Sequence, residues 1–222
     1  MMHEIIASSK TLDGSEFILY RHEEEYIIRV NGHILMSSGS SESEKILAEL
    51  GSSYLKNIAS PCVLVGGLGM GFTLRAALDL IPGESRVWAI EIVPAIIEWN
   101  QGILGNLNGF PLQDSRVCVL ESDVWDFLKN PPILFDAILL DVDNGPSAPS
   151  LKHNRRLYTN KGLTLIKQAL KDYGVLAVWS ADPDKGFSQR LGQNGFSVKT
   201  CNLPVQKGNE GNYILYLAQK SF

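Results

Sequence analysis

The sequence predicts an α/β fold: a doubly wound, Rossmann-like, mostly parallel sheet with a C-terminal antiparallel hairpin, plus a small N-terminal antiparallel β domain. Three observations predict it. Strand-like runs alternate with helical segments from residue 61 onward, a glycine-rich turn follows the first of these runs, and the residues before them carry a hairpin signal. A chain of 222 residues, 45% hydrophobic and 20% charged, has room for one main core and a small appendage.

The small β domain is expected over residues 1–40. Its predicted strands, Glu16–Arg21 and Tyr26–Met36, are rich in isoleucine, tyrosine, valine and phenylalanine, which favour extended structure. Asn31-Gly32 interrupts the second run and predicts a type I′ turn, because this turn needs a positive φ at both central residues. The two halves of that run should therefore pair as a hairpin.

The main domain is expected over residues 41–222. Ser41 and Glu44 match a capping box at the start of a first helix. The expected strands of a buried parallel sheet are Cys62–Val65, Arg86–Glu91, Arg116–Leu120, Ala137–Asp141 and Val175–Trp179. The expected helices between them are Phe72–Leu80, Pro94–Gln101, Val124–Leu128, Tyr158–Lys171 and Lys185–Gln193. Phe196–Cys201 and Tyr213–Ala218 follow with no helix between them, which predicts an antiparallel edge hairpin.

Composition narrows the class of protein. A net charge of −4 argues against broad nucleic-acid binding, which depends on a basic surface. The start Met1-Met2-His3-Glu4 has no signal-peptide or transit-peptide pattern, and no apolar run approaches membrane-spanning length. The chain is therefore expected to be cytoplasmic, with no nucleic-acid partner and no membrane partner.

Cysteines and histidines give no sign of a metal site or of a disulfide framework. Cys62, Cys118 and Cys201 are odd in number and far apart in apolar runs, so buried free thiols are expected. The four histidines have no metal-ligand spacing, and no metal is expected. The basic residues within 152–156 are expected to form a solvated loop rather than an anion site.

In a doubly wound sheet, ligands bind beyond the carboxyl ends of the strands, so residues at predicted strand ends are the candidates for function. The first candidate is the turn after the strand Cys62–Val65, which contains Gly66, Gly67, Gly69 and Gly71. Glycines allow a tight turn and let backbone N–H groups approach a ligand without a Cβ in the way. Such a turn also serves ordinary strand-to-helix packing, so its position directly before a helix matters as much as its composition.

Acidic residues lie at the ends of the next two predicted strands. Glu91 lies about twenty residues beyond the glycine turn, where a carboxylate accepts hydrogen bonds from both hydroxyls of a bound ribose. A nicotinamide cofactor is compatible with this pair of features. Asp123 follows the third strand and has two open roles: capping the next helix, or facing the amino group of an adenine.

The fourth and fifth strand ends supply the candidates for catalysis and substrate binding. Asp141 and Asp143 are two residues apart at a strand exit, and their mutual repulsion would raise one pKa toward a value useful for a general base. We favour a functional role for Asp141, whereas Asp143 fits either the substrate pocket or a plain turn before Pro146. Trp179 could stack on a substrate or cap the core.

These strand-end motifs, together with Leu157–Thr159 before a long helix, resemble the spermidine synthase family, the polyamine aminopropyltransferases. That family shares the fold of class I S-adenosylmethionine-dependent methyltransferases. The resemblance implies that the glycine turn lies near the sulfonium of an S-adenosyl nucleoside, with Glu91 on the ribose and Asp123 on the adenine amino group. It also implies that Asp141 is catalytic and that S-adenosylmethionine or its decarboxylated form is the co-substrate. A small-molecule acceptor and a second copy of the chain, in a homodimer, are the partners that it suggests.

The sequence departs from the family on the acceptor side. Gly69 stands near the place of the family's aspartate, and Leu163 and Trp179 stand where the family has tyrosine and glutamine. The pocket is therefore expected to be more apolar than a diamine site, because a buried ammonium needs polar partners. On this ground methyl transfer is slightly preferred over aminopropyl transfer. The alternative is a non-catalytic nucleoside-binding or scaffolding protein of the same fold.

Overall fold

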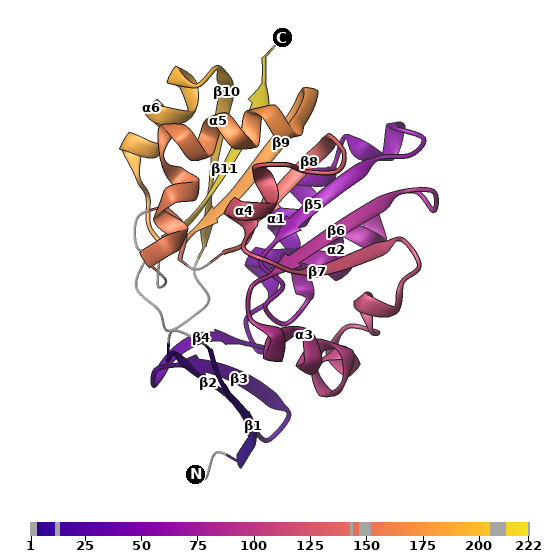
Figure 1. The fold of residues 1–222 in the computed structure, drawn as a ribbon, viewed down its shortest axis with the longest axis vertical. Coiled ribbons are helices and arrows are strands. Elements are labelled where there is room, and N and C mark those ends of the chain that lie inside the picture. The colour runs from indigo at the N-terminus through magenta and orange to yellow at the C-terminus, as the bar shows by residue number, and fades with distance from the viewer. Residues whose placement is uncertain (1–3, 12–13, 143, 147–151, 205–211, 222) are drawn as a thin grey trace.

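The computed structural model describes the chain except residues 1–3, 12–13, 143, 147–151, 205–211 and 222. Two sheets organise the described residues, a four-stranded antiparallel sheet and a seven-stranded mixed sheet. In Figure 1 the small sheet lies below the main sheet, at the end of the molecule that carries the N-terminus. None of the helices described is long and apolar enough to cross a membrane.

The small sheet confirms the predicted hairpin. Its strands, paired in chain order, are β1 (Glu4–Lys10), β2 (Glu16–His22), β3 (Glu25–Val30) and β4 (His33–Ser37). Asn31 and Gly32 have φ angles of 49° and 82°, as a type I′ turn requires. The sequence reading does not anticipate β1, which pairs antiparallel with β2. Phe17, Leu19 and Ile28 are buried and join the small sheet to the core of the main domain.

The main sheet has the strand order β10-β11-β9-β8-β5-β6-β7. Its strands are β5 (Cys62–Gly66), β6 (Arg86–Glu91), β7 (Val117–Glu121), β8 (Phe135–Leu140), β9 (Leu170–Ser180), β10 (Phe196–Pro204) and β11 (Asn212–Lys220). Strands β5 to β9 are parallel, as predicted, and β11 pairs antiparallel with both β9 and β10. The predicted C-terminal hairpin is therefore confirmed. The order reverses between β5 and β8, which is where a doubly wound sheet binds its ligands.

Helices cover both faces of the main sheet. They are α1 (Glu42–Ser52), α2 (Phe72–Leu80), α3 (Pro94–Gln101), α4 (Val124–Leu128), α5 (Asn160–Ala169) and α6 (Lys185–Gln193), with 3-10 turns at Leu55–Asn57, Ile103–Leu107, Pro111–Gln113 and Lys152–Tyr158. In Figure 1, α4, α5 and α6 lie on the near face, and α1 and α2 lie behind the sheet. Helix α5 is shorter than predicted at both ends, because Tyr158 closes a 3-10 turn and β9 begins at Leu170.

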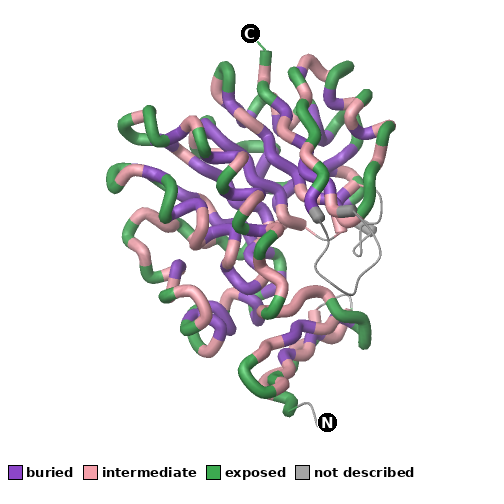
Figure 2. Tube along the Cα trace, turned by 180° about the vertical axis from the view of Figure 1, so that it is seen from behind, coloured by how far each residue is buried: buried purple, intermediate pink, exposed green. Residues whose placement is uncertain are grey.

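The central strands are buried on both faces, which explains their continuous apolar runs. Val63 and Val65 belong to a core cluster that includes residues of α1 and α2, whereas Leu64 belongs to one that includes residues of α4, α5 and α6. Figure 2 shows the centre of the molecule as its buried part. The expectation of buried thiols is wrong: Cys118 is exposed because β7 is an edge strand, and the two other cysteines are half-buried.

Candidate functional site

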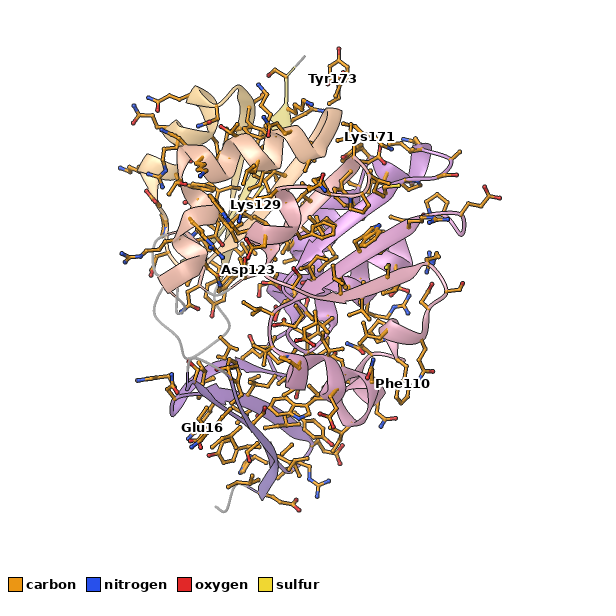
Figure 3. The ribbon with its side chains drawn as sticks, viewed as in Figure 1. Glu16, Phe110, Asp123, Lys129, Lys171 and Tyr173 are labelled. Carbon is orange, nitrogen blue, oxygen red and sulfur yellow. The ribbon has the colours of Figure 1, made fainter. Side chains whose placement is uncertain are left out.

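A pocket opens at the carboxyl ends of the parallel strands, where the small sheet meets the main sheet. Its described lining residues are Phe17, Leu35, Met36, Ser43, Glu44, Gly67, Gly69, Ile90, Glu91, Ile92, Val93, Ile96, Ser122, Asp123, Val124, Asp141, Val142, Asn144, Asn154 and Trp179. In Figure 3, Asp123 lies at the end of the main sheet that faces the small sheet, and Lys171 lies toward the opposite end. The pocket therefore gathers the ends of β5 to β9, as the fold rule predicts.

Two of the four glycines of the turn line this pocket. Gly67 and Gly69 line it, whereas Gly66 ends β5 and Gly71 precedes α2. Gly67 has a φ of 86°, and a Cβ there would lie 2.3 Å from the backbone carbonyl oxygen of Asp141. No other residue type fits this position, because the neighbouring strand end passes directly against the turn.

Three side chains that the sequence reading missed hold the turn from outside. A Cβ at Gly69 would lie 2.8 Å from the Sδ and Cε atoms of Met36, so this side chain of β4 packs directly against the glycine. The Asn100 amide donates to the carbonyl oxygen of Gly69, and the Asn108 amide donates to that of Met70, each at 2.8 Å. Isolated asparagines have no sequence pattern. The one signal is that Asn100 lies on the buried face of α3.

Glu91 is fixed by backbone N–H groups. Its side chain is buried, and its two carboxylate oxygens accept hydrogen bonds from Leu68 N at 3.0 Å and from Val93 N at 2.9 Å. Burial raises the pKa of this carboxyl above its usual range, and the backbone hydrogen bonds oppose that rise. Each carboxylate oxygen has a second lone pair, so the group keeps acceptor capacity toward the pocket.

Asp123 caps α4, which confirms one of its two open roles. Its Oδ1 accepts from Trp125 N at 2.7 Å, and its Oδ2 forms an ion pair with Arg156 at 2.5 Å. The expectation that the basic residues within 152–156 form a solvated loop is wrong for Arg156. Its guanidinium is half-buried and lies 5.2 Å from the centre of the Trp125 ring. The carboxylate lines the pocket with both oxygens engaged.

Asp141 lies directly after β8, where the sequence places it, and lines the pocket. Its Oδ2 accepts a hydrogen bond of 2.7 Å from the hydroxyl of Thr73, the second residue of α2. Burial raises the pKa of Asp141, and the Thr73 hydrogen bond opposes the rise. A carboxyl with a raised pKa at a strand end has the position and the basicity of a general base.

Glu44 is the residue that the sequence reading placed wrongly. Ser41 makes no side-chain hydrogen bond to the helix, so the predicted capping box does not form. Because the first turn of α1 borders the pocket, Glu44 turns into it, where it is only 8% exposed and accepts a hydrogen bond of 2.6 Å from Ser43. Burial, and then the negative charge of Asp141, raise the pKa of Glu44 to about 7.

The helical period contained the signal that Glu44 faces inward. Leu47, Ala48 and Gly51 form the buried face of α1, and Glu44 lies three, four and seven residues before them. Residues at these spacings share one side of a helix. In α1 the position of Glu44 on the apolar face predicts its burial, whereas the four-residue capping pattern does not.

The two candidate residues of the substrate pocket have different outcomes. Trp179 lines the pocket from the end of β9, and its ring lies 5.1 Å from that of Tyr213. Its indole N–H is buried and has no hydrogen-bond partner among the described residues. Asp143 lies outside the described residues, so its role stays a prediction.

The described lining of the pocket is acidic. It contains four carboxylates, those of Glu44, Glu91, Asp123 and Asp141, and no lysine, arginine or histidine. Within the described part of the chain, no group of three or more His, Cys, Asp and Glu side chains has metal-binding geometry. A pocket with this charge favours a cationic ligand, because buried carboxylates need partners.

Comparisons with known proteins fit this architecture. A crystal structure of spermidine synthase from Thermotoga maritima superposes with a TM-score of 0.79 at 19% sequence identity, covering 98% of this chain and 73% of that one. A structure of spermidine synthase in complex with the transition-state analogue AdoDATO gives a TM-score of 0.78 with the same identity and coverage. At this level of identity the likeness establishes the fold.

Sequence comparison extends the likeness beyond the fold. The polyamine aminopropyltransferase of Mycobacterium tuberculosis strain H37Rv is 33% identical over 124 residues, which cover 54% of this chain and 23% of that protein. The polyamine aminopropyltransferase of Leptospira interrogans is 30% identical over 182 residues, 81% of this chain and 35% of that protein. The chain thus spans about a third or less of the length of these relatives. A family model described as the spermine/spermidine synthase domain matches residues 44–202, and the chain belongs to that family.

Proposed function

We propose that this chain transfers the aminopropyl group of decarboxylated S-adenosylmethionine to an amine acceptor and releases methylthioadenosine. The observation that carries the proposal is the charge of the pocket, whose described lining holds four carboxylates and no basic side chain. Decarboxylated S-adenosylmethionine carries two positive charges, on the sulfonium and on the terminal ammonium. S-adenosylmethionine carries an additional carboxylate, which this lining would leave without a cationic partner.

The nucleoside end of the donor is assigned to the residues with fixed geometry. Glu91 would accept hydrogen bonds from the ribose hydroxyls through its free lone pairs. Asp123 would accept a hydrogen bond from the adenine amino group while it stays paired with Arg156. Gly67 and Gly69 would leave space for the sulfonium. These roles rest on the position of each residue in the pocket and on the family resemblance.

The reaction needs one base and a correct line of approach. The acceptor nitrogen attacks the aminopropyl carbon bonded to sulfur, the carbon–sulfur bond breaks, and its electron pair leaves on the neutral thioether. The proton lost from the acceptor nitrogen passes to Asp141, whose carboxylate is held by Thr73. Holding the two reactants in line supplies most of the acceleration in such a transfer, and the base adds to it.

The earlier preference for methyl transfer rested on missing polar groups and is not supported. Glu44 adds a carboxylate that the sequence reading assigned to a helix cap. Leu163 lies on the buried face of α5, in the core and outside the described lining, so its apolar character says nothing about the acceptor. The relatives are named as aminopropyltransferases, and no observation favours a methyltransferase or a non-catalytic protein.

Product analysis tests the proposal. The chain is incubated with decarboxylated S-adenosylmethionine and a panel of amines that includes putrescine and longer polyamines, and methylthioadenosine and the aminopropylated amine are measured by mass spectrometry. A parallel incubation replaces the donor with S-adenosylmethionine. We expect methylthioadenosine to form only with the decarboxylated donor. Formation of S-adenosylhomocysteine in its place would establish methyl transfer, and nucleoside binding with no product across the panel would favour the non-catalytic alternative.

A further inference from the structure

Glu44 is a buried carboxylate without a cationic partner. Its side chain is 8% exposed, it lines the pocket, and its one hydrogen bond from another side chain comes from the hydroxyl of Ser43. No ion pair to Glu44 forms within the described part of the chain. Buried carboxylates are costly unless they are paired, so the partner of Glu44 is to be sought in the ligand.

The other carboxylates of the pocket are less available to a ligand cation. Glu91 is held by two backbone N–H groups, and Asp123 by the N–H of Trp125 and by Arg156. Asp141 accepts from Thr73 and is the base of the proposed reaction. Within the described lining, Glu44 and Asp141 therefore each have a hydroxyl and no cation as side-chain partner, and because Asp141 is assigned to the base, Glu44 is left for the ligand cation.

The charged groups described around Glu44 do not neutralise its carboxylate. The negative charge of Asp141 acts on Glu44 and raises its pKa further. Lys45 follows Glu44 on α1 but is half-exposed and pairs with Glu42 at 2.9 Å. On α2, the helix packed against α1, Arg75 and Asp79 pair with each other at 2.5 Å.

The remaining neighbours of the pocket are apolar or neutral. Trp179 of β9 lines the pocket, and its ring packs against the tilted ring of Tyr213 of β11. Met36 fills the space beside Gly69, so that wall of the glycine turn offers a thioether and no charge. Glu44 and Asp141 are therefore the electrostatic partners that this part of the pocket offers to a ligand ammonium.

We infer that Glu44 is the donor-specificity residue: it binds the terminal ammonium of a decarboxylated S-adenosyl donor and excludes the carboxylate of S-adenosylmethionine. The inference rests on the proposed function and deepens it. The ammonium would supply the missing partner of Glu44, whereas a donor carboxylate would be the third negative charge beside Glu44 and Asp141. Like charges at short range in a partly desolvated pocket give discrimination that apolar contacts do not.

Binding measurements test this without any need for turnover. Calorimetry compares decarboxylated S-adenosylmethionine, S-adenosylmethionine and methylthioadenosine on the wild-type chain and on Glu44→Gln. Methylthioadenosine has the nucleoside but no charged side chain. The matched control is Glu49→Gln, because Glu49 lies on the same helix but is exposed and outside the pocket.

The wild-type chain should bind the decarboxylated donor at least about tenfold more tightly than S-adenosylmethionine, the scale of one hydrogen-bonded charge pair. Glu44→Gln should lose most of this preference and keep its affinity for methylthioadenosine, and Glu49→Gln should behave as wild type. The inference is overturned if Glu44→Gln keeps the preference, or weakens all three ligands equally as a structural defect would. It also fails if the wild-type chain does not prefer the decarboxylated donor.

A second measurement uses the wild-type chain alone and covers a variant that fails to fold. The pKa of Glu44 is about 7, so the charge facing the donor ammonium grows as the pH rises from 6 to 8. The affinity for decarboxylated donor, divided by that for methylthioadenosine, should rise over this range, and a flat ratio contradicts the inference. S-adenosylmethionine is left out, because its own α-amino group titrates near 8. Loss of all transfer activity with this ratio intact would count against the proposed function and not against Glu44.

Discussion

The half of the pocket proposed for the nucleoside, with Glu91 and Asp123, and the half proposed for the ligand cation, with Glu44 and Asp141, are held in opposite ways. In the nucleoside half, Glu91 and Asp123 have partners before any ligand arrives, from backbone N–H groups and from Arg156. In the cation half, Glu44 has a serine hydroxyl and a second carboxylate, Asp141, close by. The first half is preorganised and satisfied, whereas the second keeps an unmet charge that a cationic substrate would satisfy.

This difference shows how the side chains of each half contribute to the stability of the free protein. Hydrogen bonds to Glu91 tie the glycine turn to β6 and stabilise the fold with or without ligand. Burial raises the pKa of Glu44, Asp141 and Glu91, so the ionised form of each costs stability in the free protein, but Glu91 has hydrogen bonds from Leu68 N and Val93 N that oppose this cost. Residues selected for binding commonly cost stability in this way.

The largest effect is expected for Asp141→Asn. If Asp141 takes the proton of the acceptor, its amide should cut the single-turnover rate by roughly 10²-fold or more. An asparagine oxygen still accepts from Thr73, so the loop should stay in place and nucleoside affinity should change little. Rapid-quench measurement of methylthioadenosine release gives the rate, and calorimetry gives the affinity. A lowered melting temperature with an unchanged rate would mean that Asp141 is a structural residue.

The next largest effect is expected for Glu91→Ala, in the half proposed for the nucleoside. Glu91→Ala removes the acceptor of two backbone N–H groups and of the ribose, so methylthioadenosine affinity should fall by at least about tenfold and the melting temperature should fall with it. Glu91→Gln keeps the size of the side chain and one acceptor oxygen. It should therefore recover part of the stability. An unchanged dissociation constant in Glu91→Ala would remove this residue from the nucleoside site.

A substitution in the cation half should raise the stability of the free protein, whereas Glu91→Ala should lower it. The carboxyl of Glu44 has an ordinary pKa of 4.5 and a folded-state pKa of about 7, so the folded chain binds more protons between these values and its stability falls as the pH rises through them. Glu44→Gln removes this cost and should stabilise the free protein at pH 8 on the order of 2 kcal/mol. Urea unfolding at pH 5 and pH 8 measures the difference. A variant less stable than wild type at pH 8 would contradict the account.

The smallest effect is expected for a substitution of Arg156, the ion-pair partner of Asp123. Arg156→Met keeps an apolar stem over Trp125 and removes the ion pair to Asp123, which is partly exposed and worth about 1 kcal/mol or less. Adenosine affinity should therefore change by no more than about fivefold. The direction is informative when adenosine is compared with inosine, which lacks the amino group. A selective gain for adenosine in the variant would indicate that Arg156 competes with adenine for Asp123.

The sequence predicted the nucleoside half better than the cation half for a physical reason. Gly67, Glu91 and Asp123 lie at or just beyond the ends of β5, β6 and β7, and a doubly wound sheet brings such strand ends together whatever the rest of the chain does. Glu44 and Met36 reach the pocket from α1 and β4. The helical period places Glu44 on the buried face of α1, but only tertiary packing brings that face to the pocket. A four-residue capping pattern at Glu44 was outweighed by the buried face of its helix, because tertiary packing overrides local capping signals.

The most direct test of the two-half pocket is a crystal structure of the chain with decarboxylated S-adenosylmethionine bound. We expect ribose hydroxyls within hydrogen-bond distance, about 3.2 Å or less, of the Glu91 carboxylate. We expect the terminal ammonium at the same distance from Glu44. A nucleoside bound away from Glu91, or an ammonium bound away from Glu44, would contradict this expectation.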